Sequence, residues 1–338
     1  MRIILDGSVS TVKRLRVSLG TLVAIEATAD DNVTVGGIAL AAATAHRQIR
    51  AKAARRPTAL AGTAATEVVP TALAEAATAD VIATEVLTAE AAIERAFEAI
   101  EQVNRLMHPR AEGSDLARIS SAPLHAPTKV HASIGRLLNF AKRIHTLTEG
   151  VFDPCTPAQP GRLSDIEVSA GETEVVCRAP VALDFGGFAK GYAVDCAVEA
   201  LMATGCRAGL VNAGGDLRVF GPSTEPVFVR GPAGELTNIE LADAALAVSD
   251  AGSQQRPPEH QGYYVRKLDS DAPTAATQAV PTVSYAAVIA STALVADALA
   301  KCVLLCPPAV ATRTLRAFGA FQPFADREIA SVRPKTPP

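Results

Sequence analysis

Tryptophan is absent from the 338-residue sequence, and all aromatic residues together make up only 4% of it. This scarcity argues against base-stacking platforms for nucleic acid and against a protein-binding patch built on Trp. The formal net charge is -3, and no Lys/Arg-rich run provides the basic field that nucleic acid or an anionic membrane surface needs. No apolar run reaches the roughly 18 to 20 residues of a membrane span. We therefore expect neither a nucleic-acid partner nor a membrane span.

Signals for export and for a structural metal are also lacking. The first 20 residues do not show the ordered basic, apolar and small-residue regions of a signal peptide, and no Cys near the start is available for lipidation. We therefore expect a cytoplasmic protein. The six cysteines are scattered, and Cys302 and Cys306 lie four residues apart on an expected helix without a His or a second Cys pair to complete a zinc set. We expect all six to be buried thiols.

Apolar residues are abundant enough for a large core, since 49% of the sequence is hydrophobic. This length can form one large domain or two smaller ones. Four divisions are predicted. Residues 1–40 form N-terminal strands with a hairpin around Gly20, and residues 41–86, rich in Ala and Thr with few large apolar side chains, form an insertion of low order. Residues 87–325 form the main domain, and residues 326–338 form a disordered tail.

Within the main domain, hydrophobic periodicity predicts helices that alternate with strands. Thr88 is a plausible N-cap of a helix that ends at His108-Pro109, and residues 133–148 form a second amphipathic helix. The other expected elements are two short strands within 161–178, a strand at 181–185, a helix after Gly187, short strands to about Val248, a strand at 284–290, and a helix stopped by Pro307 and Pro308. We assign the chain to the α/β or α+β class, with mixed sheets and packed helices.

Two paired-glycine turns stand out, one in LDFGGFAKGYAVD (183–195) and one in NAGGDLRVFG (212–221). Gly186-Gly187 permits a tight turn and a close approach of a ligand to the backbone. Lys190 lies in the first turn of the following helix, where a pyrophosphate can bind. However, GGFAKG matches neither GxGxxG nor GxxxxGK[ST]. From spacing alone, structural turns and a phosphate site both remain open, and Asp216 beside the second turn is best interpreted as a turn residue.

Taken together with other segments, the first of these strings resembles the signature of the ApbE-type FAD:protein FMN transferases. NAGGDLRVFG is similar to the family's second glycine motif. The remaining matches follow in the family's order: SLGT (18–21), GSDLARIS (113–120), GVFDPCTPA (150–158), AVSDAG (247–252) and ADALAK (296–301). The resemblance runs from about residue 13 to residue 310 and implies an ApbE-like fold.

The resemblance also implies an activity. Enzymes of the family split FAD at its pyrophosphate and transfer FMN to a Thr hydroxyl of a target flavoprotein, with Mg²⁺ bridging the phosphates; some members hydrolyse FAD to FMN and AMP. By motif position, the residues expected to contact the flavin nucleotide are Leu19, Arg110, Val151, Phe152, Asp153, Asp184 and Lys190. The Gly187 carbonyl and the Asp297 carboxylate are expected to face the metal. Asp153 and Asp184 can alternatively shape turns, and Lys190 can alternatively be a solvated helix residue.

The sequence departs from the family pattern around the expected metal. Lys301 stands where the family has a metal-binding Thr, and Asp297 and Lys301 at i and i+4 on one helix face can meet. This ammonium can occupy the place of Mg²⁺, or the two residues can form a surface ion pair. The family's His-x-x-Asp-Pro segment is not recognisable, so no general base is assigned. Ser249-Asp250 stands where Ser-Gly is usual. By the position of the ADALAK motif, we assign Asp297 and Lys301 to the catalytic centre. Because of these departures, a non-catalytic FAD-binding protein and an FAD hydrolase remain as alternatives.

Overall fold

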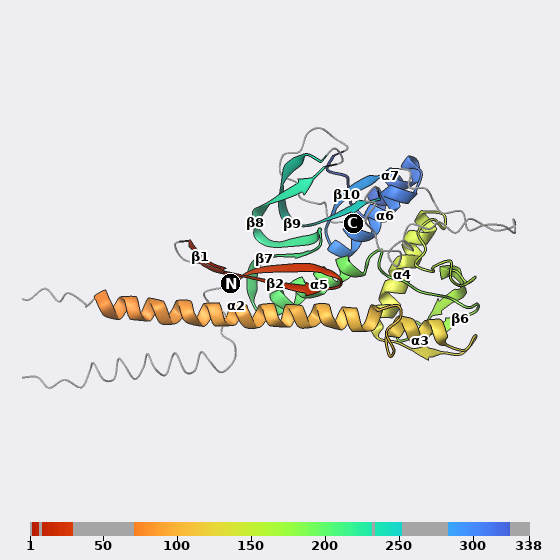
Figure 1. Ribbon diagram of the computed structural model, residues 1–338, viewed down its shortest axis with the longest axis horizontal. Coiled ribbons are helices and arrows are strands. Elements are labelled where there is room, and N and C mark those ends of the chain that lie inside the picture. Colours follow the sequence, from red (N-terminus) through yellow and green to blue (C-terminus); the bar gives the residue numbers. More distant parts are fainter. Residues whose placement is uncertain (1, 7–8, 30–70, 232–233, 252–282, 325–338) are drawn as a thin grey trace, which may run out of the picture.

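A computed structural model of the protein describes residues 2–6, 9–29, 71–231, 234–251 and 283–324. The predicted insertion up to residue 70, the predicted tail, and the segment that contains His260 and Tyr264 lie outside these residues. The division of the chain into domains thus stays a prediction. Figure 1 shows a large sheet with helices packed against it, and a smaller sheet at one end of the molecule.

The large sheet has seven strands in the order β1-β2-β3-β7-β8-β9-β10. All its described neighbours pair antiparallel, so the α+β assignment is the applicable one. The strands are β1 (Arg2–Asp6), β2 (Val9–Ser18), β3 (Thr21–Ala29), β7 (Cys206–Ala213), β8 (Asp216–Arg230), β9 (Leu236–Asp250) and β10 (Tyr285–Ala290). The predicted hairpin around Gly20 is confirmed as β2–β3. The expectation of short strands up to Val248 was wrong, because β8 and β9 form one long, bulged ladder.

The helices are α2 (Thr71–Met107), α3 (Asp115–Ser121), α4 (Ala132–Leu147), α5 (Ala189–Ala203), α6 (Ala293–Leu305) and α7 (Pro308–Ala317). In Figure 1, α2 runs the length of the large sheet, where it packs against β2, β3 and α5. Its 37 residues span about 55 Å at 1.5 Å per residue. The expected start at Thr88 was wrong, because the helix begins at Thr71. The end before His108 is confirmed.

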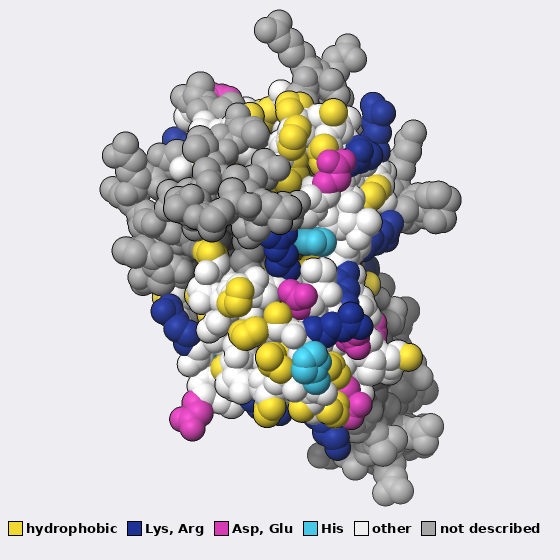
Figure 2. Space-filling model, turned by 90° about the vertical axis from the view of Figure 1, so that its right-hand side faces the viewer, with side chains coloured by type: hydrophobic (Ala, Val, Ile, Leu, Met, Phe, Trp, Pro, Cys, Tyr) yellow, Lys and Arg dark blue, Asp and Glu magenta, His cyan; other side chains and the backbone are white. Residues whose placement is uncertain are grey.

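The smaller sheet, in the order β4-β6-β5, lies beside α3 and α4. Its strands are β4 (Thr128–Lys129), β5 (Ile166–Val168) and β6 (Glu174–Cys177), and a 3-10 turn, η1 (Leu163–Asp165), precedes β5. The two short strands expected within 161–178 are therefore confirmed. Figure 2 shows this end of the molecule, where acidic and basic side chains intermingle with apolar ones. On this face, no large patch of one charge is visible.

The core joins the large sheet to α2, α4, α5 and α6 through apolar side chains. Five of the six cysteines are buried in it as thiols, as expected, whereas Cys196 is only half-buried. None of the helices within the described ranges combines the length and the apolar character that crossing a bilayer requires. The expected cytoplasmic location stays a prediction.

Candidate functional site

Two loops that carry predicted site residues run side by side. The backbone NH of Thr156 donates to the Ala182 carbonyl at 2.8 Å, and that of Asp184 donates to the Pro154 carbonyl at 2.9 Å. A single antiparallel bridge joins Cys155 to Leu183. The strand predicted at 181–185 was wrong in this respect, because the segment pairs with the loop 150–158 and joins neither sheet. The pairing brings two of the sequence motifs together.

Aromatic packing supports these loops from beneath. Phe188 lies 4.7 Å from Phe185 and 5.9 Å from Phe152, measured between ring centroids. Val151 and Phe152 are only 8% and 7% exposed. Their side chains therefore belong mainly to the core, and a ligand on this loop would meet the backbone and ring edges rather than open side chains.

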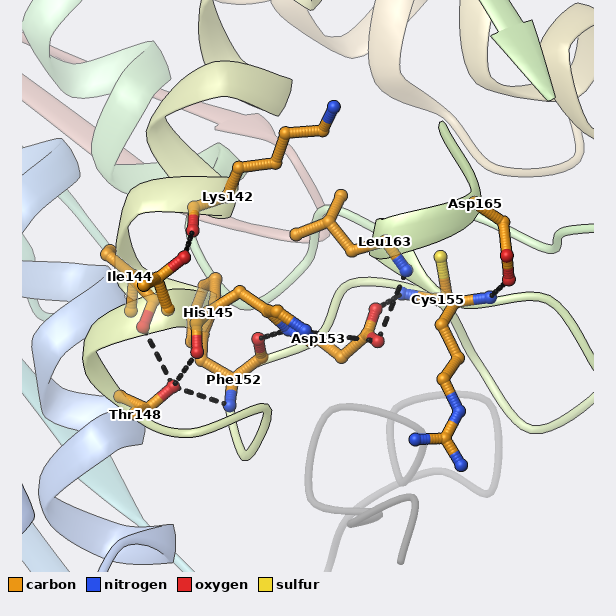
Figure 3. Close-up of polar contacts among 11 residues, drawn as sticks. Lys142, Ile144, His145, Thr148, Phe152, Asp153, Cys155, Leu163 and Asp165 are labelled. Atoms are coloured by element: carbon orange, nitrogen blue, oxygen red, sulfur yellow. Dashed lines mark hydrogen bonds and ion pairs between the residues drawn. The ribbon is translucent and has the colours of Figure 1, made fainter. Parts of the chain in front are cut away.

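Asp153 organises its own loop, as Figure 3 shows. Its Oδ1 accepts a hydrogen bond from the Cys155 backbone NH at 2.8 Å, and its Oδ2 accepts one from the Leu163 NH at 3.3 Å. The side chain is 6% exposed, so these bonds satisfy a carboxylate that burial would otherwise destabilise. The turn-shaping alternative for Asp153 thus has direct geometric support.

His145 is a further loop-fixing residue, which the sequence interpretation missed. From the end of α4, its Nδ1 donates to the Phe152 carbonyl at 2.9 Å and lies 3.9 Å from Oδ2 of Asp153. One turn later, Thr148 Oγ1 accepts from the Phe152 NH at 3.0 Å. The spacing of His145 and Asp153 in the sequence gives no signal for this contact, because the helix end and the turn at Gly150 bring them together.

Asp184 shapes the first glycine turn. Its Oδ1 accepts a hydrogen bond from the Gly186 NH at 2.8 Å, the geometry of an Asx turn. The chain then turns through Gly187 into α5, whose N-cap residue, Phe188, offers no side-chain oxygen. The start of α5 therefore needs an acceptor from elsewhere in the chain.

That acceptor is Asp297 on α6. Its Oδ2 accepts a hydrogen bond from the Gly191 NH at 2.9 Å, so the carboxylate caps the N-terminus of α5 and interacts favourably with the helix dipole. The approach is close: a Cβ atom on Gly191 would lie 2.2 Å from the Ala293 carbonyl oxygen and 2.7 Å from Cβ of Asp297. Only glycine permits this separation of α5 from α6.

Asp297 also forms an ion pair with Lys301 one turn later on α6, which confirms that the two side chains meet. The side chain of Asp297 is fully buried and that of Lys301 is 6% exposed. The surface ion-pair alternative was therefore wrong. A Cβ atom on Gly187 would lie 4.0 Å from Cγ of Lys301, so the first glycine turn passes directly over this lysine.

A second ion pair joins Lys190 on α5 to Asp216 at the start of β8. We call Lys190, Asp216, Asp297 and Lys301 the charge cluster. Burial raises the pKa of Asp216, the nearby Asp297 carboxylate raises it further, and the ammonium groups of Lys190 and Lys301 oppose that rise. The four groups thus influence one another electrostatically.

Asp216 was interpreted as a turn residue, and its membership of the charge cluster was missed. It does begin the strand after Gly214-Gly215, but its side chain is 1% exposed and points into the cluster. Its position directly after the paired glycines of NAGGDLRVFG was the signal available in the sequence. Lys190 is one-third exposed and is the member of the cluster most accessible to solvent.

The turn that carries Leu19 lies against the second glycine turn. Leu19 and Gly20 have positive φ angles of 53° and 70°, and a Cβ atom on Gly214 would lie 2.3 Å from Oγ1 of Thr21. The structure therefore places Leu19 near the start of β8, where Asp216 stands.

Arg110 is exposed in the loop after α2, and its described hydrogen bond is local, from its backbone NH to Nδ1 of His108 at 3.2 Å. That contact does not connect Arg110 to the charge cluster.

Asp195 positions the helix that carries Asp297 and Lys301. Its carboxylate accepts hydrogen bonds from the backbone NH groups of Ala293 and Leu294 at 2.9 and 2.8 Å, and from Nη1 of Arg218 at 2.8 Å. Burial raises the pKa of Asp195, and the Arg218 guanidinium opposes that rise. Thr292 adds a second cap to the same end of α6. Sequence reasoning missed Asp195 because its backbone partners on α6 are about 98 residues away.

The arrangement does not fit Mg²⁺. The ion requires a near-octahedral set of oxygen ligands. Oδ1 and Oδ2 of Asp297 are taken by Lys301 and by the Gly191 NH, and Oδ2 of Asp216 is taken by Lys190. No group of three or more His, Cys, Asp or Glu residues suited to a metal ion occurs in the portion of the chain that the structure covers.

Comparison with known proteins agrees with this fold. The model of the ApbE family matches residues 77–321, and the chain belongs to the ApbE family. A curated FAD:protein FMN transferase from Chlamydia pneumoniae is 26% identical over an alignment of 184 residues, and the match covers 46% of this chain and 57% of that protein. The chain thus spans little more than half the length of this relative.

Solved structures with the same fold include two flavin transferases. The apo form of Pseudomonas stutzeri flavinyl transferase ApbE superposes with a TM-score of 0.62 at 14% identity, covering 94% of this chain and 92% of that one. The flavin transferase ApbE from Vibrio cholerae gives a TM-score of 0.61 at 16% identity, covering 93% of each chain. At these identities the likeness shows the fold alone.

Proposed function

We propose that this protein binds FAD at the charge cluster and transfers FMN from it to a Thr hydroxyl of an acceptor flavoprotein. The observation that carries the proposal is that turns from separate sequence motifs lie next to the charge cluster or to one another. The turn at Gly187 passes over Lys301, and Asp216, directly after the second glycine turn, pairs with Lys190. The turn that carries Leu19 contacts that second glycine turn through Thr21. The names of the relatives point to the same reaction.

Lys190 is the residue proposed to bind the pyrophosphate. Its ammonium carries a positive charge and donates hydrogen bonds, its side chain is one-third exposed, and its ion pair with Asp216 holds it beside the second glycine turn. The Gly186-Gly187 turn beside it lets a phosphate approach the backbone without meeting a Cβ atom. Val151, Phe152, Asp153 and Asp184 are proposed to bind the nucleotide through the loop backbone that they hold in place.

In the proposed reaction, the acceptor hydroxyl oxygen attacks the phosphorus atom of the FMN portion. A new phosphoester bond forms, the bond to the bridging pyrophosphate oxygen breaks, and AMP leaves. Negative charge develops on the phosphate oxygens, and the ammonium of Lys190 is placed to stabilise it. The hydroxyl proton must pass to a base, which we leave unassigned.

Binding is tested by titrating flavin fluorescence with protein. We expect Lys190→Gln to weaken FAD binding about 10- to 100-fold, because a charge-assisted hydrogen bond contributes about 1.5–3 kcal/mol. Lys129→Gln is the matched control, since Lys129 is exposed on β4 and its loss should leave the affinity unchanged. Equal effects of the two substitutions, or no binding by the wild type, would refute the proposed site.

Transfer is tested separately by incubating the protein with FAD and a Thr-containing acceptor domain and measuring the acceptor's mass. Covalent attachment of FMN supports the transferase. Free FMN and AMP would instead identify a hydrolase. Intact FAD, bound but unchanged, would identify a non-catalytic FAD-binding protein, an alternative that the occupied carboxylate oxygens of Asp297 favour.

A further inference from the structure

The charge cluster holds two buried carboxylates that influence each other electrostatically, and each is paired with a lysine. Asp216 and Asp297 are 1% and 0% exposed, and each forms an ion pair with one lysine. Two carboxylates and two ammonium groups give a formal charge of zero. Like charges buried this close strongly disfavour each other's ionisation unless cations lie beside them.

The two lysines are not equivalent. Lys190 is one-third exposed, whereas Lys301 is 6% exposed and rises from α6 between Asp297 and the Gly187 turn. Its ammonium therefore lies in the dry part of the cluster, where a charge has the largest effect. Lys301 influences the ionisation of Asp216 as well as pairing with Asp297.

Among the residues that the structure describes, one carboxylate oxygen of the cluster lacks a hydrogen-bond partner. Across the described residues, Oδ1 of Asp216 is buried and accepts no hydrogen bond. An unsatisfied buried acceptor of this kind is unusual and leaves one oxygen ligand available if the local positive charge were removed.

We propose that the Lys301 ammonium is the resident cation of this site, so that the protein binds FAD without a divalent metal. A small residue bearing an oxygen at position 301 would open a divalent cation site between Asp297 and Asp216. The statement about FAD rests on the proposed function, whereas the statement about metal binding does not.

The metal experiment uses the full chain without FAD. Wild-type protein, Lys301→Thr and Lys301→Met are titrated with Mg²⁺ and with Mn²⁺ by calorimetry, and their melting is followed by circular dichroism with KCl at matched ionic strength as the control. We expect no saturable metal binding by the wild type. We expect both variants to melt lower, and only Lys301→Thr to regain stability with Mg²⁺ or Mn²⁺, because Met offers no oxygen ligand.

Saturable binding of Mg²⁺ by the wild type, or equal responses of the Thr and Met variants, would overturn the inference. If neither variant folds, the wild-type titration alone still decides it. With FAD present, the dissociation constant should change by less than about twofold between EDTA and excess Mg²⁺, whereas a metal-dependent site would show about a tenfold change or more. Absence of FAD binding in every condition would refute the proposed function and leave the metal result standing.

Discussion

Replacement of Gly191 by Ala tests how α5 and α6 hold the charge cluster together. The new Cβ atom would lie 2.2 Å from the Ala293 carbonyl oxygen and 2.7 Å from Cβ of Asp297. Both neighbours belong to α6 and cannot rotate away, so the helices must separate. Separation also weakens the hydrogen bond from the Gly191 NH to Asp297, which is 2.9 Å long.

The expected cost follows from three contributions. Overpacking costs about 1–3 kcal/mol, loss of a hydrogen bond to a charged group costs about 1.5–3 kcal/mol, and the higher helix propensity of Ala returns about 1 kcal/mol. We therefore expect Gly191→Ala to lower the free energy of unfolding by about 1.5–5 kcal/mol. The melting temperature should fall by at least about 3 °C.

Far-ultraviolet circular dichroism during urea unfolding measures this change, since the sequence has no Trp for a fluorescence assay. Gly187→Ala is the matched control, because the nearest atom to its new Cβ is 4.0 Å away and its φ angle is not in the left-handed region. Its stability should remain within about 0.5 kcal/mol of the wild type. Equal stability of Gly191→Ala and Gly187→Ala would refute the reasoning that glycine sets the separation of α5 and α6.

Two further predictions concern the surroundings of the cluster. Asp195→Ala should lower the free energy of unfolding by about 3–5 kcal/mol, because it leaves Arg218 and two backbone NH groups of α6 without their acceptor. Glu167→Ala, which removes an exposed pair with Arg178, should cost less than about 1 kcal/mol in the same urea titration. Burial raises the pKa of Tyr192 to about 12. The folded protein therefore keeps the Tyr192 proton that the unfolded chain loses near pH 10. The contribution of Tyr192 to the free energy of unfolding falls as the pH rises from about 10 to 12. Tyr192→Phe should make unfolding less sensitive to pH in that range, and an unchanged pH dependence would contradict the assignment.

The long helix α2 shows why its start could not be predicted from periodicity. Residues 71–87 contain few large apolar side chains, so no amphipathic stripe marks them as a helix. Their Ala content nevertheless gives them high helix propensity, and they continue without interruption into the stripe that begins near Ile93. The end of the helix was predictable because Pro109 restricts the residue before it.

Near the other end of the chain, a pair of prolines both follows the end of one helix and begins the next. Pro307 and Pro308 were interpreted as the end of a helix, and α6 does end at Leu305. However, Pro308 is also the first residue of α7, a position that tolerates Pro because its missing NH has no partner in a helix. The helix after the stop was missed because one residue pair carries both signals.

In the candidate site, the local contact could be predicted from the sequence, whereas the contacts between distant residues could not. The i,i+4 meeting of Asp297 and Lys301 is local and was predicted from spacing. The pairing of Lys190 with Asp216 and the cap that Asp195 provides for α6 join residues 26 and about 98 positions apart. Contacts of that kind depend on the packing of α5 against β8 and α6, which no periodicity in a single sequence specifies.

Asp297 connects the stability of the fold to the chemistry of the site. One carboxylate oxygen caps α5, and the other pairs with Lys301. A change that removes both oxygens therefore alters the start of α5, the position of Lys190 on its first turn, and the charge balance with Asp216 together. Loss of FAD binding after such a change would say nothing about catalysis by itself. Substitutions at Lys301 are more informative, because they change the charge of the cluster while the cap on α5 can stay in place.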